Sequence, residues 1–224
     1  MKRLRFWVIN FRTFVHPITS RKMFRYSFIV FIFFSLTLSS QNFGTSLLKD
    51  INLNRNTAYD NTFKGISHSV TPLSVATPVA LFGVSLITKD TALRQNSFYT
   101  GATLITTVVI VTSLKYGIAR TRPYIRYPEI DNVTVEDSPS FPSGHTSEAF
   151  ALATSLCMAY PRWYIIAPSY IWAGSVAYSR LHLGVHYPGD VLAGAFIGAD
   201  SAFLCYKGQQ WLTKKREKKH YKPY

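Results

Sequence analysis

Three short clusters in this chain combine side chains that bind anions with side chains that attack or protonate. In chain order they contain Lys115 and Arg122; Ser143, Gly144 and His145; and Arg180, His186 and Asp190. Arginine guanidinium groups match phosphate oxygens two at a time, and lysine adds a mobile positive charge. A neutral imidazole is a nucleophile when a carboxylate fixes its tautomer, and a second imidazole can protonate a leaving oxygen. This inventory indicates chemistry on a phosphate-like oxyanion.

The spacing within these clusters forms a three-part signature. The chain reads KYGIARTRP from Lys115 to Pro123, PSGH from Pro142 to His145, and SRLHLGVHYPGD from Ser179 to Asp190. It resembles the type 2 phosphatidic acid phosphatase (PAP2) superfamily, which also includes vanadium haloperoxidases and bacterial acid phosphatases. Eleven specified positions match in the right order. The match covers residues 115 to 190 directly and the surrounding helices only loosely.

The resemblance implies a role for each matched residue. His186 would be the nucleophile that becomes a phosphohistidine, His145 the general acid, and Asp190 the carboxylate that orients His186. Phosphate binding would come from Lys115, Arg122, Arg180, Ser143 and Gly144. No metal or other cofactor is implied.

Local geometry supports some of these roles. On a helix, the seven residues from Lys115 to Arg122 make about two turns, which would return both to nearly one face. The PSGH stretch is typical of a helix start, where unpaired backbone N–H groups bind anions. Asp190 follows His186 by one turn, and Pro188 suits the first turn of a helix. Taken alone, Lys115 and Arg122 could be positive flanks of a membrane helix, and His145 an interfacial histidine.

Apolar segments must position the clusters. Spanning helices need about 20 mostly apolar residues, and the candidates are 26–40, 70–87, 97–116, 146–160, 163–178 and 189–206. They predict an all-α integral membrane bundle of about six transmembrane helices, or five if the first segment is a cleaved signal peptide. Glycines such as Gly194 and Gly198 often mark close contacts between membrane helices.

The first segment stays open between a retained helix and a signal peptide. A basic N-terminus (1–25) precedes it, and Met23 is an alternative start. The PAP2-type domain is expected at 41–206 and a basic tail at 207–224. Residues 41–69 predict one amphipathic interfacial helix and a loop.

The distribution of positive charge distinguishes a membrane protein from a nucleic-acid-binding protein. The 224 residues are 47% hydrophobic and 16% charged, with a net charge of +14. Fourteen of the 25 Lys and Arg residues lie within 1–25 and 207–224, beside apolar segments. This is the pattern of cytoplasmic ends, so we expect no nucleic-acid partner and a site on the opposite face of the membrane.

Several other charged residues have no place in the signature. We expect Arg120 and Arg126 to be solvated or to contact lipid headgroups. We expect His182 to make a structural contact or to contact the edge of the substrate. Asp200 lies in an apolar segment, so we expect its side chain to face the bundle and form a hydrogen bond there. The acidic stretch 129–137 is either a substrate-gating loop or a plain connector.

These observations predict a multi-pass phosphatase of a bacterial inner membrane, with its site facing the periplasm. Its substrate would be the phosphate monoester or diphosphate end of a lipid, such as phosphatidic acid, phosphatidylglycerophosphate, undecaprenyl diphosphate or lipid A phosphate. The Ser-Gln-Asn end of the first segment favours the last two. A lipid phosphotransferase of the same fold and a catalytically silent scaffold are the alternatives. A haloperoxidase would need vanadate. The oligomeric state is left open.

Overall fold

The structure is a computed structural model that describes residues 41–220, and all regular elements in that range are helices. The chain divides into two compact units, Met1–Gln41 and Asn42–Tyr224. The second unit contains all three signature clusters. The basic N-terminus (1–25) and the predicted first span (26–40) lie outside the described residues.

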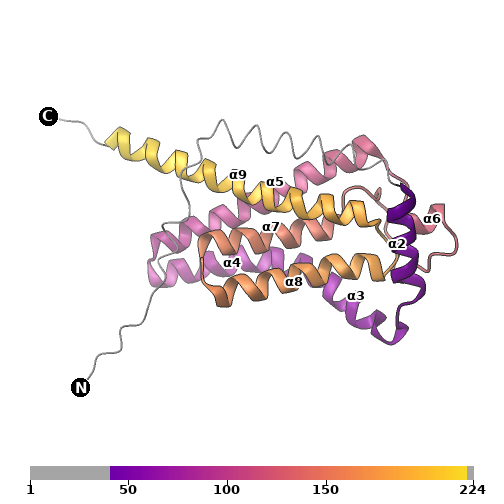
Figure 1. The fold of residues 1–224 in the computed structure, drawn as a ribbon. Coiled ribbons are helices and arrows are strands. Elements are labelled where there is room, and N and C mark those ends of the chain that lie inside the picture. The colour runs from indigo at the N-terminus through magenta and orange to yellow at the C-terminus, as the bar shows by residue number, and fades with distance from the viewer. Residues whose placement is uncertain (1–40, 221–224) are drawn as a thin grey trace, which may run out of the picture. The chain divides into compact units, whose positions relative to one another are not determined.

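The helices follow one another through short connections, apart from the longer connection 127–143 between α6 and α7 (Figure 1). In chain order they are α2 (Gln41–Leu53), η2 (Thr57–Tyr59), α3 (Asp60–His68), α4 (Val70–Thr88), α5 (Thr91–Ile118), α6 (Pro123–Arg126), α7 (Gly144–Ala159), α8 (Trp163–His182) and α9 (Pro188–His220). The five later predicted spans correspond to α4, α5, α7, α8 and α9, so the all-α prediction is confirmed. Helix α9 runs well past 206 because the sequence 207–220 is rich in Gln, Lys and other good helix formers and contains no proline.

The outer faces of the bundle carry large apolar side chains. Ile87, Ile105 and Ile171 are 84%, 68% and 68% exposed. Water would disfavour such a surface, whereas lipid accommodates it. Among the described residues, Thr57–Thr88 and Thr91–Arg126 are long and apolar enough to cross a membrane. The total of about six crossings stays a prediction.

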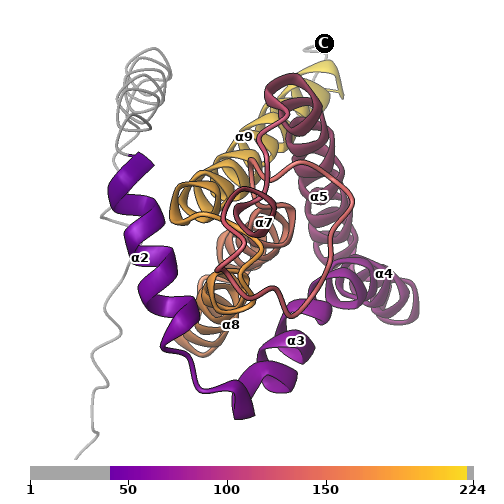
Figure 2. The ribbon, with the colours of Figure 1, turned by 90° about the vertical axis from the view of Figure 1, so that its right-hand side faces the viewer.

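Helix α7 lies at the centre of the bundle, in contact with α4, α5, α8 and α9 (Figure 2). Its contact with α9 is made through glycines. A Cβ atom on Gly194 would lie 2.7 Å from the carbonyl oxygen of Ser143, and one on Gly198 would lie 2.1 Å from that of Ser147. The two backbones therefore touch directly, as small residues allow in membrane helices. The expected close contacts are confirmed at both glycines.

The segment before the bundle differs from expectation. Two helices, α2 and α3, replace the single amphipathic helix predicted for 41–69. The break falls at an Asn-rich stretch, where Asn56 caps η2 by accepting from the backbone N–H of Ala58 at 3.0 Å. Asparagine side chains compete with the helix for backbone hydrogen bonds and so favour such breaks.

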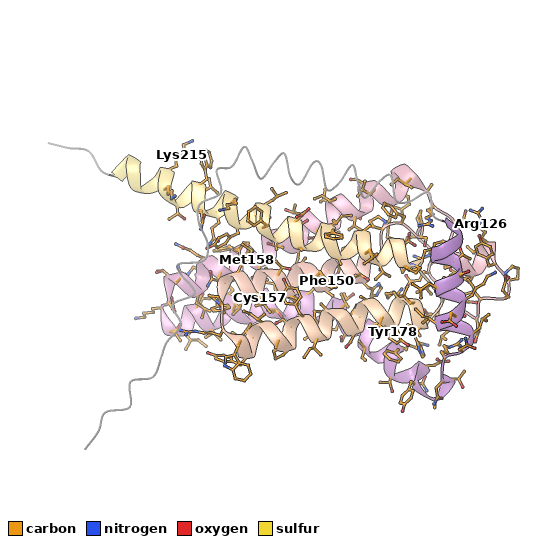
Figure 3. All side chains as sticks on the ribbon, viewed as in Figure 1. Arg126, Phe150, Cys157, Met158, Tyr178 and Lys215 are labelled. Carbon is orange, nitrogen blue, oxygen red and sulfur yellow. The ribbon has the colours of Figure 1, made fainter. Side chains whose placement is uncertain are left out.

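One end of the bundle gathers the signature clusters. The C-terminal ends of α5 and α8 and the N-terminal ends of α7 and α9 lie at the end that carries α6 (Figure 1). Arg126 of α6 marks this end, whereas Cys157 and Lys215 lie toward the other (Figure 3). The basic tail and the predicted site therefore occupy opposite ends of the second unit.

The expectation for Asp200 is wrong. Its side chain is exposed on the outer face of α9 and does not face the bundle. The inward positions of this part of α9 are taken by small residues, such as Gly198 and Ser201, that pack closely inside the bundle.

Candidate active site

The first cluster is assembled by a turn and not by one helical face. Helix α5 ends at Ile118, Ala119 adopts a left-handed conformation with φ of 49°, and Arg122 is the N-cap of α6. The prediction that Lys115 and Arg122 share a helix is therefore wrong, because the chain leaves the helix before Arg122. Lys115 is nevertheless buried at the same end, and its Nζ donates to the carbonyl oxygen of Pro139.

Arg122 is locked in place by backbone carbonyl groups. It is 2% exposed, its Nε donates to the carbonyl oxygen of Ser138 at 2.8 Å, and its Nη1 donates to that of Val185 at 2.9 Å. Nη1 also lies 3.3 Å from Nε2 of His186. The first and third clusters therefore meet at this guanidinium group.

Arg180 supplies a second buried cation near the end of α8. It is 1% exposed, and its Nη1 donates to the hydroxyl of Ser67 on α3. Its Nε is buried without a hydrogen-bond partner among the described residues. Its Nη2 pairs with Oε1 of Glu136, whose Oε2 lies 3.8 Å from Nη2 of Arg122.

Glu136 therefore joins the two arginines from the connection between α6 and α7. Burial acts to raise its pKa, but the neighbouring positive charges, chiefly Arg180, hold the pKa of Glu136 below its usual value. The carboxylate is consequently ionised at neutral pH. The sequence placed Glu136 in a possible gating loop but did not predict this pairing.

The second cluster begins α7, as predicted. Ser143 is the N-cap residue and Gly144 the first residue of the helix. The backbone N–H of Ser143 donates to the carbonyl oxygen of Asp190 at 3.0 Å, and its hydroxyl lies 2.9 Å from that of Thr146. His145 is partly buried and lies within electrostatic reach of Arg180 and Glu136. The start of α7 is thus fixed directly beside the third cluster.

The third cluster lies in the turn between α8 and α9. Gly184 makes this turn possible, because its φ of 72° is strained for other residues and an added Cβ would lie 2.5 Å from the carbonyl oxygen of Asp131. His186 is 1% exposed, and its Nδ1 lies 3.5 Å from Oδ2 of Asp190. That distance exceeds a normal hydrogen bond, so Nδ1 is buried without a hydrogen-bond partner among the described residues. Burial lowers the pKa of His186 to about 3, so the imidazole is neutral at neutral pH.

Asp190 is held by residues that sequence reasoning did not assign. This fully buried carboxylate accepts from Nη1 of Arg120 at 2.6 Å, from the hydroxyl of Ser140 at 2.5 Å and from the backbone N–H of Tyr187 at 3.1 Å. The Arg120 guanidinium also lies 4.0 Å from the centre of the Tyr187 ring. The prediction that Arg120 is solvated or contacts headgroups is wrong, because the turn after α5 directs it at Asp190. Its position two residues before Arg122 was the available signal.

The other charged residues have simpler surroundings. Arg126 is exposed, as expected. His182 is buried, with its Nε2 2.7 Å from Oδ1 of Asp60, so the structural alternative holds for it. Among residues 41–220, no group of three or more His, Cys, Asp or Glu side chains is arranged to hold a metal ion.

Comparison with known families decides the relationship. The model of the PAP2 superfamily matches residues 96–214, which is more than half of the chain. The chain belongs to the PAP2 superfamily. All three clusters of this PAP2 protein lie inside the matched range.

Curated relatives of this PAP2 protein include two lipid phosphatases. It is 46% identical over 67 residues to the lipid A 4'-phosphatase of Bacteroides thetaiotaomicron, covering 30% of this chain and 29% of that protein. It is 37% identical over 113 residues to the undecaprenyl-diphosphatase of Sulfolobus acidocaldarius, covering 46% and 52%. The chain thus spans less than two thirds of the length of either relative.

Solved structures extend the similarity over a larger share of the chain. LpxE of Aquifex aeolicus matches with a TM-score of 0.62 at 26% identity, over 72% of this chain and 93% of that one. A transmembrane PAP2-type phosphatidylglycerolphosphate phosphatase from Bacillus subtilis matches with a TM-score of 0.66 at 24% identity, over 82% and 94%. The second similarity shows the fold alone. The apolar outer faces of the bundle and the two segments long and apolar enough to cross a bilayer indicate a membrane protein.

Proposed function

We propose that the chain is a membrane lipid phosphatase that works through a phosphohistidine on His186. One observation carries the proposal: two buried guanidinium groups, Arg122 and Arg180, converge beside a buried neutral imidazole. Two fixed guanidinium groups can donate paired hydrogen bonds to the oxygens of a phosphoryl group, and a neutral imidazole retains the lone pair needed for attack.

The geometry supports different roles for the two ring nitrogens of His186. Its Nε2 faces Arg122, which is proposed to hold the phosphate, whereas its Nδ1 faces Asp190. Nε2 would attack phosphorus, and the bond from phosphorus to the leaving oxygen would break. The imidazole then carries a positive charge, which the Asp190 carboxylate stabilises as the distance to Nδ1 shortens.

His145 is proposed to act at the leaving oxygen. As a general acid it would donate a proton to the departing lipid hydroxyl or phosphate. As a general base it would then take a proton from the water that hydrolyses the phosphohistidine, which releases inorganic phosphate and restores His186. Its place in the first turn of α7, within electrostatic reach of Arg180 and Glu136, supports a position beside the proposed phosphate site.

The remaining signature residues would neutralise the transferred group. Lys115 would bring a third positive charge from the end of α5. The backbone N–H groups at Gly144 and the hydroxyl of Ser143 would donate to phosphate oxygens at the start of α7. The hydroxyl of Ser143 would have to turn away from Thr146 to do so.

The substrate proposed is a phosphorylated lipid of the bacterial envelope. The named activities of the relatives, on lipid A and on undecaprenyl diphosphate, support these two candidates. The location proposed is the inner membrane, with the site facing the periplasm. Its support is the position of the site at the end of the bundle opposite Lys215 and the basic tail (Figure 3).

The test of the activity is phosphate release by the purified full chain in EDTA. The panel contains phosphatidic acid, phosphatidylglycerophosphate, undecaprenyl diphosphate and lipid A, and acid quenching with labelled substrate traps phosphohistidine. His186→Ala should abolish release and trapping while the variant remains folded, as a cooperative unfolding transition would show. Release by the alanine variant at the wild-type rate would refute the mechanism. Phosphate found on a second lipid would identify a phosphotransferase instead.

The test of orientation is labelling in intact spheroplasts, in a background that lacks Cys157 and Cys205. Val135, 76% exposed in the connection between α6 and α7, is replaced by cysteine in one variant and the exposed Lys214 of the tail in another. A membrane-impermeant thiol reagent should label the first variant at once and the second only after permeabilisation. The reverse pattern would place the site in the cytoplasm.

A further inference from the structure

The two arginines proposed to bind phosphate already hold an anion of the protein itself. Glu136 pairs with Arg180 through one carboxylate oxygen and lies 3.8 Å from Arg122 through the other. A carboxylate that joins two guanidinium groups imitates two oxygens of a phosphoryl group. We propose that Glu136 is an internal competitor that fills the phosphate site until substrate displaces it, an inference that rests on the proposed function.

The surroundings of Glu136 allow its side chain to leave. It lies on the connection between α6 and α7, and its side chain is 23% exposed, whereas those of the two arginines are 2% and 1% exposed. The carboxylate therefore lies on the solvent side of the cations. The hydroxyl of Tyr124 binds the backbone of Glu136 at both its carbonyl oxygen (3.2 Å) and its N–H (3.3 Å). Displacement consequently requires rotation of one side chain and no movement of the backbone.

The arginines stay in position without Glu136. Arg122 keeps its hydrogen bonds to the carbonyl groups of Ser138 and Val185, and Arg180 keeps its bond to the hydroxyl of Ser67. Both cations are therefore pre-organised for an incoming anion. While the site is empty, Glu136 offsets the cost of two buried positive charges that lie close together.

The same position affects substrate selection. A phosphate group must compete with a carboxylate that is held by charge-assisted hydrogen bonds, so weakly bound anions are excluded. Ligands with further contacts to the protein, such as a lipid with its acyl chains in the membrane, can offset this cost. Glu136 thus favours lipid phosphates over free inorganic phosphate, which is also the product.

The test measures binding of inorganic phosphate to the full chain in detergent, by titration calorimetry and by the rise in unfolding temperature, without turnover. Glu136→Gln removes the charge but keeps the size. It should bind inorganic phosphate about 10- to 100-fold more tightly than wild type, since a hydrogen bond to a charged group contributes this much. KM for a soluble aryl phosphate should fall in the same direction. The matched control is Glu129→Gln on the same connection, because Glu129 pairs with the partly exposed Lys49 at 2.7 Å, away from the arginines.

The outcomes separate this proposal from the enzymatic one. Unchanged or weaker phosphate binding by Glu136→Gln, with the control equal to wild type, refutes the internal competitor even if lipids are hydrolysed. Tighter binding of inorganic phosphate by Glu136→Gln, together with no hydrolysis of any lipid by the wild type, supports Glu136 as an internal competitor and refutes the proposed phosphatase activity. If Glu136→Gln does not fold, Glu136→Asp serves instead: its shorter side chain cannot reach both arginines, so it too should bind phosphate more tightly. Equal affinity in that variant and wild type refutes the proposal.

Discussion

Adding one methyl group at Gly198 should disturb both the bundle and the site. In Gly198→Ala, the new Cβ would lie 2.1 Å from the carbonyl oxygen of Ser147 and 2.8 Å from the backbone nitrogen of Ala151. Both neighbours are backbone atoms of α7, so no side chain can rotate away. Ordinary contact begins at 3.4 Å, so α7 and α9 must separate by about 1 Å. Overpacking of this kind costs about 1–3 kcal/mol.

The matched control is Gly208→Ala on the same helix, where an added Cβ meets nothing within 4 Å. It should stabilise α9 slightly, because alanine is a better helix former by up to about 1 kcal/mol. For a protein of this size, 1 kcal/mol corresponds to about 2–4 °C in unfolding temperature. Gly198→Ala should therefore unfold at a temperature several degrees below that of Gly208→Ala when both are measured in the same detergent.

The effect on activity follows from the length of α9. Gly198 lies eight residues, or about 12 Å, beyond Asp190 along the helix. Separation of α7 from α9 would move Ser143 and His145 relative to Asp190, and a displacement of about 1 Å in a catalytic group can cost as much as 10²-fold in rate. The assay is phosphate release at saturating substrate. Equal unfolding temperatures and rates for the two alanine variants would refute the reasoning, because they would show that the helices do not touch as closely as the structure indicates.

Three further substitutions test contacts around the site. Arg120→Ala should lower the unfolding free energy by about 2–3 kcal/mol, which is below the full cost of breaking a buried pair because Arg120 is 27% exposed. It should also reduce kcat, because Asp190 loses a hydrogen-bond donor that holds it in place. The control is Arg126→Ala at an exposed position, and equal effects of the two variants would contradict this role of Arg120. Gly184→Ala should cost more than the about 1–3 kcal/mol of its left-handed backbone, because the new Cβ would also lie 2.5 Å from the carbonyl oxygen of Asp131, as denaturant unfolding would show. Acidification should destabilise the wild type more than His186→Gln. The pKa of His186 is about 3 in the folded state and 6.5 ordinarily, so between these pH values only the unfolded state binds the proton. The free energy of unfolding therefore falls by up to about 1.4 kcal/mol per pH unit as the pH drops. Parallel pH profiles would show that His186 is not buried as a neutral group.

Much of this arrangement could be predicted from residue types and spacing. Long apolar segments predicted the helices because a membrane bundle leaves few other structures for them. Pro142 to His145 predicted the start of α7, and Pro188 predicted the start of α9, because these residues have strong local preferences. The pair of His186 and Asp190 was also predictable, since the two residues are four positions apart at the start of a helix and their proximity needs no knowledge of the fold.

The sequence by itself thus determined the helices, the family signature and the local pair of His186 and Asp190, all of which depend on neighbours in the chain. Only the tertiary structure decided which charges meet across the chain. Arg120 reaches Asp190 over 70 positions, and Glu136 reaches Arg180 over 44. Both contacts depend on where the chain turns, as it does through the left-handed Ala119. The direction of a turn is not encoded in a repeating pattern but results from packing, which places buried charges where an opposite charge can compensate them.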